Sequence, residues 1–113
     1  MRRVAANRVY INNKEFYNNH IIELFDSYVV NHFPLQSELA MTEWLGGIIM
    51  LTDASEVDTS SVYSVEDFYR KAEESDSHTK YLKAYHIYGV DIQSGKFKEN
   101  SMIVKLTCSS SEF

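Results

Sequence analysis

The sequence predicts a single α+β domain: a mainly antiparallel sheet of about six strands, arranged as a sandwich or an open barrel, with one amphipathic helix packed on it. Eight Tyr, six Phe and one Trp in 113 residues, together with Val and Ile, favour strands over helices. Hairpin signals occur towards both ends of the chain, and a single segment, residues 64–75, has helical periodicity. A chain of this length fits one domain, which we expect to span residues 1–107 with a flexible tail at 108–113.

The first third of the chain predicts a strand followed by a hairpin. Residues 3–11 end in a β-prone trio and stop at Asn12-Asn13, a pair that favours turns. Residues 16–25 and 28–33 are β-prone runs separated only by Asp26-Ser27, which is the spacing of a β-hairpin. A two-residue loop predicts the pairs Phe25–Tyr28, Leu24–Val29 and Ile22–Asn31.

Both faces of this hairpin would then be partly apolar. In the predicted register one face carries His20, Ile22, Leu24, Val29, Asn31 and Phe33, and the other carries Ile21, Glu23, Phe25, Tyr28, Val30 and His32. Large apolar patches are unusual on a soluble monomer, and two-fold dimers are the commonest way to bury them. We therefore expect a homodimer; the alternative is a compact sandwich or barrel that covers both faces internally. The residues expected at the dimer contact are Ile21, Phe25, Tyr28 and Val30.

Residues 42–51, Thr-Glu-Trp-Leu-Gly-Gly-Ile-Ile-Met-Leu, are the most informative segment of the chain. The apolar run at 48–51 is short and partly β-branched, which predicts a buried strand. Gly46-Gly47 supplies backbone freedom for a sharp turn or a close approach. Trp44 is large enough to anchor a core, and its replacement by Ala is then expected to cost roughly 3–5 kcal/mol.

The second half of the chain predicts a loop, the helix and two further strands. Residues 52–63 are acidic and rich in hydroxyl groups, and we expect an exposed loop. Ser64 is a good helix N-cap, and the apolar stripe that follows has i, i+3, i+4, i+7 spacing. Residues 80–92 and then 97 and 102–106 predict strands joined by a turn at Gly95. The stripe consists of Val65, Phe68, Tyr69 and Ala72.

Composition excludes several classes of function. A net charge of −5 and a pI near 5.3 lack the basic surface that nucleic-acid binding requires. No apolar run approaches the ~20 residues of a membrane span, and the N-terminus lacks the apolar stretch of a signal peptide, so we expect a cytoplasmic protein. The single cysteine, Cys108, cannot form an internal disulfide or a thiolate zinc cage, and we expect an inert surface or terminal thiol. Nothing indicates a cofactor.

The four histidines provide one catalytic hypothesis. None of them forms a metal-ligand motif. In the predicted register His32 lies diagonally across from Glu23 on one face, where a carboxylate can orient an imidazole. The same spacing also suits an ordinary cross-strand polar pair. The histidines are His20, His32, His78 and His86.

Two carboxylates provide a second catalytic hypothesis. Glu43 and Asp53 flank the segment at 44–51 and could act as acid and base if their surroundings separate their pKa values. A strand between them would hold them well apart, and the alternative for Glu43 is a cap or a salt bridge near the turn. The order of glycines and strand is the reverse of a phosphate-binding loop. We therefore predict a non-catalytic interaction or accessory module, with a small hydrolase or isomerase using His32 and Glu23, or Glu43, as the alternative. The candidate functional or structural hot spot comprises Glu43, Trp44, Gly46, Gly47, His32 and Glu23.

Two resemblances accompany this interpretation. Arg8-Val9-Tyr10, Phe33-Pro34-Leu35, residues 42–47 and residues 84–101 resemble a group of small uncharacterised bacterial proteins with a T-E-W-[LI]-G-G core, a resemblance that implies no activity. Ala6-Asn7-Arg8-Val9-Tyr10 and His20–Leu24 are similar to the small β-sandwich strands that precede the barrel of metal-dependent amidohydrolases. That second similarity implies only a related β topology, because no metal-binding His motif is present.

Overall fold

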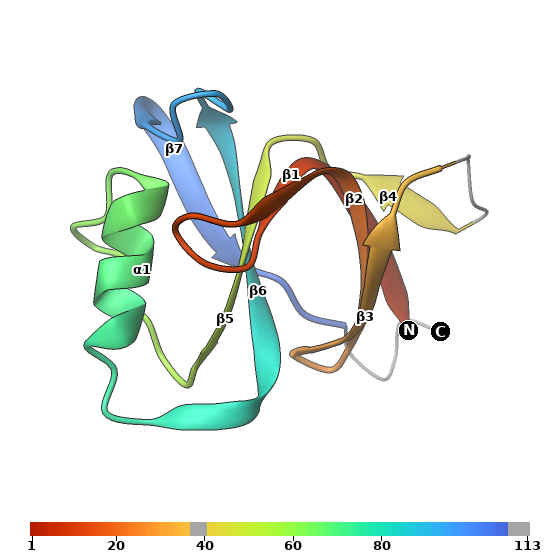
Figure 1. Ribbon diagram of the computed structural model, residues 1–113, viewed down its shortest axis with the longest axis horizontal. Coiled ribbons are helices and arrows are strands. Elements are labelled where there is room, and N and C mark those ends of the chain that lie inside the picture. The colour runs from red at the N-terminus through yellow and green to blue at the C-terminus, as the bar shows by residue number, and fades with distance from the viewer. Residues whose placement is uncertain (37–40, 109–113) are drawn as a thin grey trace.

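A computed structural model describes residues 1–36 and 41–108 of the chain. Within these residues it contains seven strands and one helix (Figure 1). The elements are β1 (Arg2–Tyr10), β2 (Phe16–Phe25), β3 (Tyr28–Pro34), β4 (Thr42–Trp44), β5 (Ile48–Ala54), α1 (Val65–Glu73), β6 (His78–Val90) and β7 (Phe97–Lys105). The prediction of a β-rich chain with one helix is confirmed.

Five of the strands close into a barrel, in the order β1-β2-β3-β6-β5 and back to β1. All the pairings around the barrel are antiparallel except that of β5 with β1, which is parallel. The expected sandwich or open barrel of about six strands is therefore wrong in its arrangement. Closure follows from β1, which pairs with β2 on one side and with β4 and then β5 on the other. Strand β7 extends the sheet from β6 outside the barrel.

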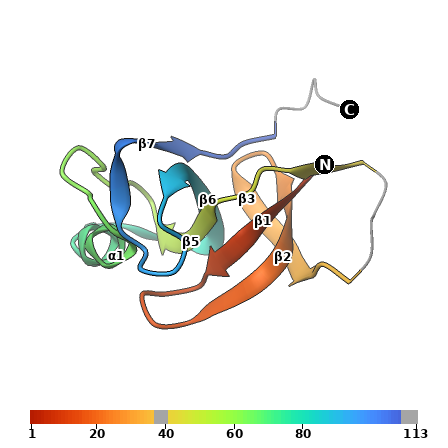
Figure 2. The same ribbon diagram turned by 90° about the horizontal axis from the view of Figure 1, so that it is seen from above.

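The molecule has two apolar cores, and β5 separates them. Ile49 and Leu51 point into the barrel, whereas Ile48 and Met50 point outwards, beneath α1. All four side chains are fully buried, because successive residues of a strand face opposite sides. This explains why the run at 48–51 is continuously apolar. Figure 2 shows α1 on one side of the barrel, beside β5 and β7, with β2 and β3 on the other side.

The helix forms as the sequence predicts. The Ser64 side chain accepts a hydrogen bond of 3.0 Å from the Asp67 backbone N–H, which caps the first turn. The Tyr69 hydroxyl lies 2.8 Å from the Leu51 carbonyl oxygen and 3.1 Å from that of Tyr10, so α1 is tied to two strands. The four residues of the predicted stripe, Val65, Phe68, Tyr69 and Ala72, are all buried.

The β2–β3 hairpin forms, but its register changes partway along. The predicted pairs Phe25–Tyr28 and Leu24–Val29 are present. A bulge between Glu23 and Leu24 then pairs Glu23 with Asn31 and Ile22 with His32. The predicted pair Ile22–Asn31 is therefore wrong, and the assignment of His32 to the face of Glu23 is wrong with it.

Four other expectations are corrected. Ile21 is fully buried and cannot belong to a dimer contact. Cys108 is buried and its backbone N–H bonds to the Asp26 carbonyl oxygen at 2.6 Å, so it is not a surface thiol, and the rest of the predicted tail lies outside the described residues. The expected loop at 52–63 is shorter, because β5 continues to Ala54, and it buries Val57 and Val62. The fourth correction concerns Trp44, which lies in the candidate site.

Candidate functional site

The turn Leu45-Gly46-Gly47 joins two short strands, β4 and β5, which both pair with the same edge of β1. Strand β4 pairs with residues 3–5 of β1, and β5 pairs with residues 8–10. Gly46 and Gly47 have φ values of +69° and +62°, the left-handed region that favours glycine. A Cβ on Gly47 would lie 2.5 Å from the Ile87 carbonyl oxygen. The expected turn and close approach are both present at this pair.

Two side chains from distant strands fasten the turn. The Asn7 side-chain oxygen accepts a hydrogen bond of 2.8 Å from the Gly47 N–H. The His86 ring nitrogen Nε2 lies 3.0 Å from the Gly46 carbonyl oxygen, and because a carbonyl only accepts, Nε2 must carry a proton. Burial lowers the pKa of His86, against the opposing effect of this bond. A neutral imidazole donor therefore holds the turn.

Trp44 is 55% exposed, so the prediction that it anchors the core is wrong. The physical reason is its register on β1. Trp44 pairs with Ala5, whereas the neighbours of Ala5 in β1, Val4 and Ala6, point into the barrel. Alternation along the strand places Trp44 on the outer face. Met41, three residues before it, is 90% exposed.

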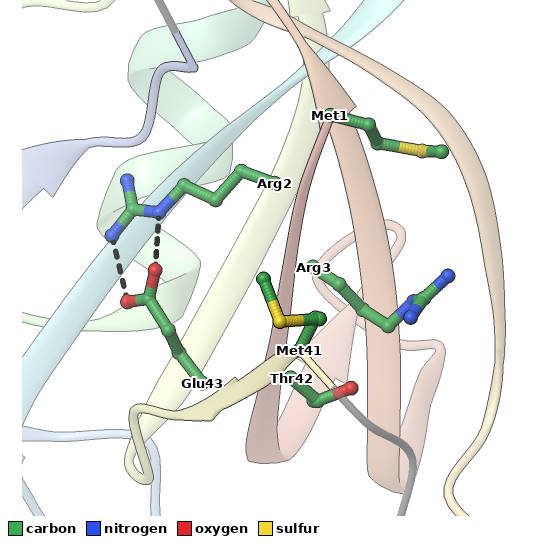
Figure 3. A pocket seen from close by; sticks show the side chains of 6 residues that line it. All are labelled: Met1, Arg2, Arg3, Met41, Thr42 and Glu43. Carbon is green, nitrogen blue, oxygen red and sulfur yellow. Dashed lines mark hydrogen bonds and ion pairs between the residues drawn. The ribbon is translucent and has the colours of Figure 1, made fainter. Parts of the chain in front are cut away.

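Glu43 is committed to an ion pair. The Arg2 guanidinium donates to both of its carboxylate oxygens, at 3.0 and 3.1 Å, and also to the Thr107 carbonyl oxygen at 2.9 Å. The hydrogen bond from Arg2 lowers the pKa of Glu43. Figure 3 shows this pair at the edge of a pocket of about 550 Å³ beside β4. The pocket is lined by Met1, Arg2, Arg3, Met41, Thr42 and Glu43.

A series of contacts extends from the glycine turn to the β6–β7 ribbon. The His86 ring, bonded to Gly46, lies 5.6 Å from the Tyr88 ring between centroids. The Tyr88 hydroxyl lies 3.7 Å from the Met102 sulfur. Tyr88 and Met102 are both exposed. Met41 and Trp44 are exposed on the β4 side of the same turn. We use the name Trp44 surface for these four exposed residues, Met41, Trp44, Tyr88 and Met102.

His32 and Glu23 do not meet. The bulge places them on opposite faces of the hairpin. Glu23 accepts two hydrogen bonds from Arg3, at 2.9 and 2.7 Å, and one of 3.3 Å from Asn31. The Nδ1 of His32 lies 2.9 Å from the Nε2 of His20. The proposed catalytic pair is thus replaced by an ion pair and a pair of histidines.

The sequence did not reveal the pair formed by His20, which is buried, and His32, which is half-buried. The Tyr17 ring stacks on His20 at 4.5 Å between centroids, and His20 is 3% exposed. Within the described residues, its Nδ1 has no hydrogen-bond partner. Burial first, and then the neighbouring His32, lower the pKa of His20 to about 4. His20 is therefore neutral at pH 7.

The remaining candidates are dispersed. Asp53 is exposed and its carboxylate lies 2.9 Å from the Nδ1 of His78, whereas Glu43 is bonded to Arg2. Among residues 1–36 and 41–108, no three His, Cys, Asp or Glu side chains are grouped to hold a metal ion. Sequence reasoning missed Arg2, Asn7 and His86, because their partners lie about 40 residues away and no local spacing signals such contacts.

No helix in the described part of the chain is long and apolar enough to cross a membrane. Comparisons of the chain with protein-family models, curated protein sequences and solved structures give no match.

Proposed function

We propose that this chain is a non-catalytic interaction module, located in the cytoplasm, that binds an extended apolar segment of a partner protein along β4 and the Trp44 surface. The observation that carries the proposal is the exposure of Trp44, 55%, in a segment that is otherwise firmly held. Trp, Tyr, Met and Arg are the residue types enriched in protein interfaces. The Trp44 surface contains Trp, Tyr and Met.

The backbone on the C-terminal side of Trp44 is held by contacts to β1 and β6. The Leu45 N–H bonds to the Ala5 carbonyl oxygen at 2.9 Å, and Gly46 and Gly47 are bonded to His86 and Asn7. A rigid, exposed aromatic residue loses little conformational entropy on binding. This arrangement supports a preformed anchor for a partner.

The extended form of the partner segment follows from β4. In the described part of the chain, β4 pairs with β1 alone, so its other edge presents backbone groups that an added strand can bond. Side chains of that strand would alternate, and every second one would face Trp44.

The enzyme alternative has less support. The hydrogen bond from Arg2 lowers the pKa of Glu43, whereas a general acid at neutral pH needs a raised pKa. Glu23 is bonded by Arg3. His32 is bonded to His20 rather than to a carboxylate.

Selection of random phage-displayed peptides on the chain tests the proposal, with Trp44 emission as the signal because it is the only Trp. Selected peptides that lack Trp are expected to shift that emission in the wild type. In isothermal titration calorimetry they are expected to bind Trp44→Ala at least about tenfold more weakly than the wild type, a loss of about 1.4 kcal/mol. Tyr63→Ala is the control, since Tyr63 is 69% exposed but lies outside the Trp44 surface. Failure to select any peptide, or equal binding to Trp44→Ala, would reject this function.

A further inference from the structure

A pocket opens where β6 separates from β5 at one end of the barrel. The β5–β6 ladder is continuous as far as Thr52, and the next pair joins Ala54 to His78. Residues 79–82 of β6 therefore bulge away from Asp53, the one residue of β5 that faces them. Irregularities of this kind are common at barrel rims and beside functional sites. A pocket of about 240 Å³ lies between this part of the sheet and the C-terminal half of α1 (Figure 1).

The interior of this pocket is mainly apolar. Leu51 and Leu82 line it from the barrel, and Tyr69 and Ala72 line it from α1. The Tyr69 hydroxyl is bonded to the carbonyl oxygens of Leu51 and Tyr10, so its ring is held in place as a wall. A volume of about 240 Å³ holds about eight water molecules at about 30 Å³ each, which is the space of one ring with a short chain. The pocket therefore suits a small ligand with an apolar body.

Two carboxylates lie at the rim of the pocket. Asp53 and Glu73 both line it, and both are exposed. The Nδ1 of His78 lies 2.9 Å from the Oδ1 of Asp53; in the part of the chain that the structure describes, the Oδ2 of Asp53 and the Glu73 carboxylate have no bonded partner. Glu73 is also the last residue of α1, where backbone carbonyl groups add partial negative charge. Even with His78 protonated, the two carboxylates outnumber the one imidazolium, so the rim is negative.

The cations of this region do not neutralise the rim. No lysine or arginine lines the pocket. Arg70 and Lys71 of α1 are each paired with a neighbouring carboxylate, and the Lys83 ammonium donates to a backbone carbonyl oxygen. Lys14 and Lys80 are exposed and lie outside the lining. The negative rim, in a chain of net charge −5, therefore favours a cationic ligand.

We propose that this pocket binds a small primary amine whose apolar body is a single ring or a short alkyl chain. The apolar body lies against Leu51, Leu82 and Tyr69, and the ammonium group donates to the carboxylates of Asp53 and Glu73. An ammonium group has three N–H donors and no acceptor, which matches a rim that offers carboxylate oxygens. The pocket shares no residue with the Trp44 surface, so this site is independent of the function proposed above.

Three probes of similar size separate the effect of charge from that of shape. Phenethylamine carries the ammonium group, phenethyl alcohol has a hydroxyl in its place, and hydrocinnamate has a carboxylate. In NMR titrations of the isotope-labelled chain, the amine is expected to bind with a Kd on the order of 1 mM and to shift the amide signals of Asp53, Glu73 and Leu82. The alcohol is expected to bind about fivefold or more weakly, because charge-assisted hydrogen bonds are about twice as strong as neutral ones. The carboxylate probe is expected not to bind at about 10 mM.

Asp53→Asn and Glu73→Gln each remove one charge from the rim with little change of shape. Both residues are exposed, so both variants should fold, which circular dichroism checks. Each variant is expected to bind phenethylamine about threefold or more weakly and phenethyl alcohol as the wild type does. Glu66→Gln, the same kind of change at an exposed residue of the first turn of α1, is the control and leaves both affinities unchanged.

Two kinds of result would overturn the proposal. An amine that binds no more tightly than the alcohol, or equally well to the two rim variants and the control, would reject the carboxylates as the ammonium site. Failure of all three probes to bind, or shifts confined to residues away from Asp53, Glu73 and Leu82, would reject the pocket itself.

Discussion

The two glycines of the Leu45-Gly46-Gly47 turn allow steric clash to be separated from backbone strain. Both have positive φ, +69° and +62°, so an alanine at either position costs about 1–2 kcal/mol for the left-handed conformation, less about 0.4–1 kcal/mol from the reduced entropy of the unfolded chain. They differ in what a Cβ would meet. At Gly46 the nearest atom is the Asn7 side-chain oxygen at 3.5 Å, an ordinary contact, whereas at Gly47 it is the Ile87 carbonyl oxygen at 2.5 Å.

The Ile87 carbonyl cannot easily move aside. Ile87 lies in β6 between Ile48 of β5 and Ile103 of β7, so a shift of its backbone disturbs two ladders. Overpacking of this kind adds about 1–3 kcal/mol. We therefore expect Gly46→Ala to cost about 1 kcal/mol and Gly47→Ala about 3 kcal/mol.

Urea unfolding of the two variants and the wild type, followed by far-UV circular dichroism, measures the difference in the free energy of unfolding. Thermal unfolding of the same three proteins measures the difference in melting temperature. At about 4–5 °C per kcal/mol for a chain of this size, the melting temperatures of the two variants should differ by about 8–10 °C. Equal destabilisation of the two variants would show that Gly47 does not approach the Ile87 carbonyl in solution, and that the turn is positioned differently.

Three further predictions concern burial. The pKa of His20 falls from its ordinary 6.5 to about 4 on folding, so the folded state binds fewer protons than the unfolded state. Stability that is present above pH 6.5 is therefore lost as the pH falls towards 4. At about 1.4 kcal/mol per pH unit, the loss is about 2–3 kcal/mol between pH 7.5 and 4.5. Urea midpoints at the two pH values should show this loss in the wild type, and a loss of the same size in His20→Gln would contradict the assignment. Tyr69→Phe removes the hydroxyl that lies within 3.1 Å of two strand carbonyls and should lower the free energy of unfolding in urea by about 1–2 kcal/mol. An unchanged free energy of unfolding would contradict the role of these two hydrogen bonds in holding α1 to the strands. Trp44→Ala should cost about 1 kcal/mol or less, since the ring is 55% exposed; a loss of 3 kcal/mol or more would return Trp44 to the core and remove it as a binding anchor.

The elements that the sequence alone determined are those whose causes are local. The helix is one, because its cap, Ser64, and its buried stripe lie within nine residues of each other. The buried strand at 48–51 is another, because a continuous apolar run predicts a strand that is covered on both faces, as is observed. The turn at Gly46-Gly47 is a third, because only glycine takes positive φ without cost.

Tertiary structure decided what depends on partners far along the chain. Closure of the barrel depends on β1 pairing on both sides, and nothing local to β1 shows this. A bulge of one residue moved His32 away from Glu23 and brought it to His20, since each step along a strand reverses the face. The parallel register of β4 on β1 turned Trp44 outwards, although its sequence context suited a core residue. A side chain's type sets how much apolar area it can bury, but the face on which it lies is set by the register of strands that the chain brings together only on folding.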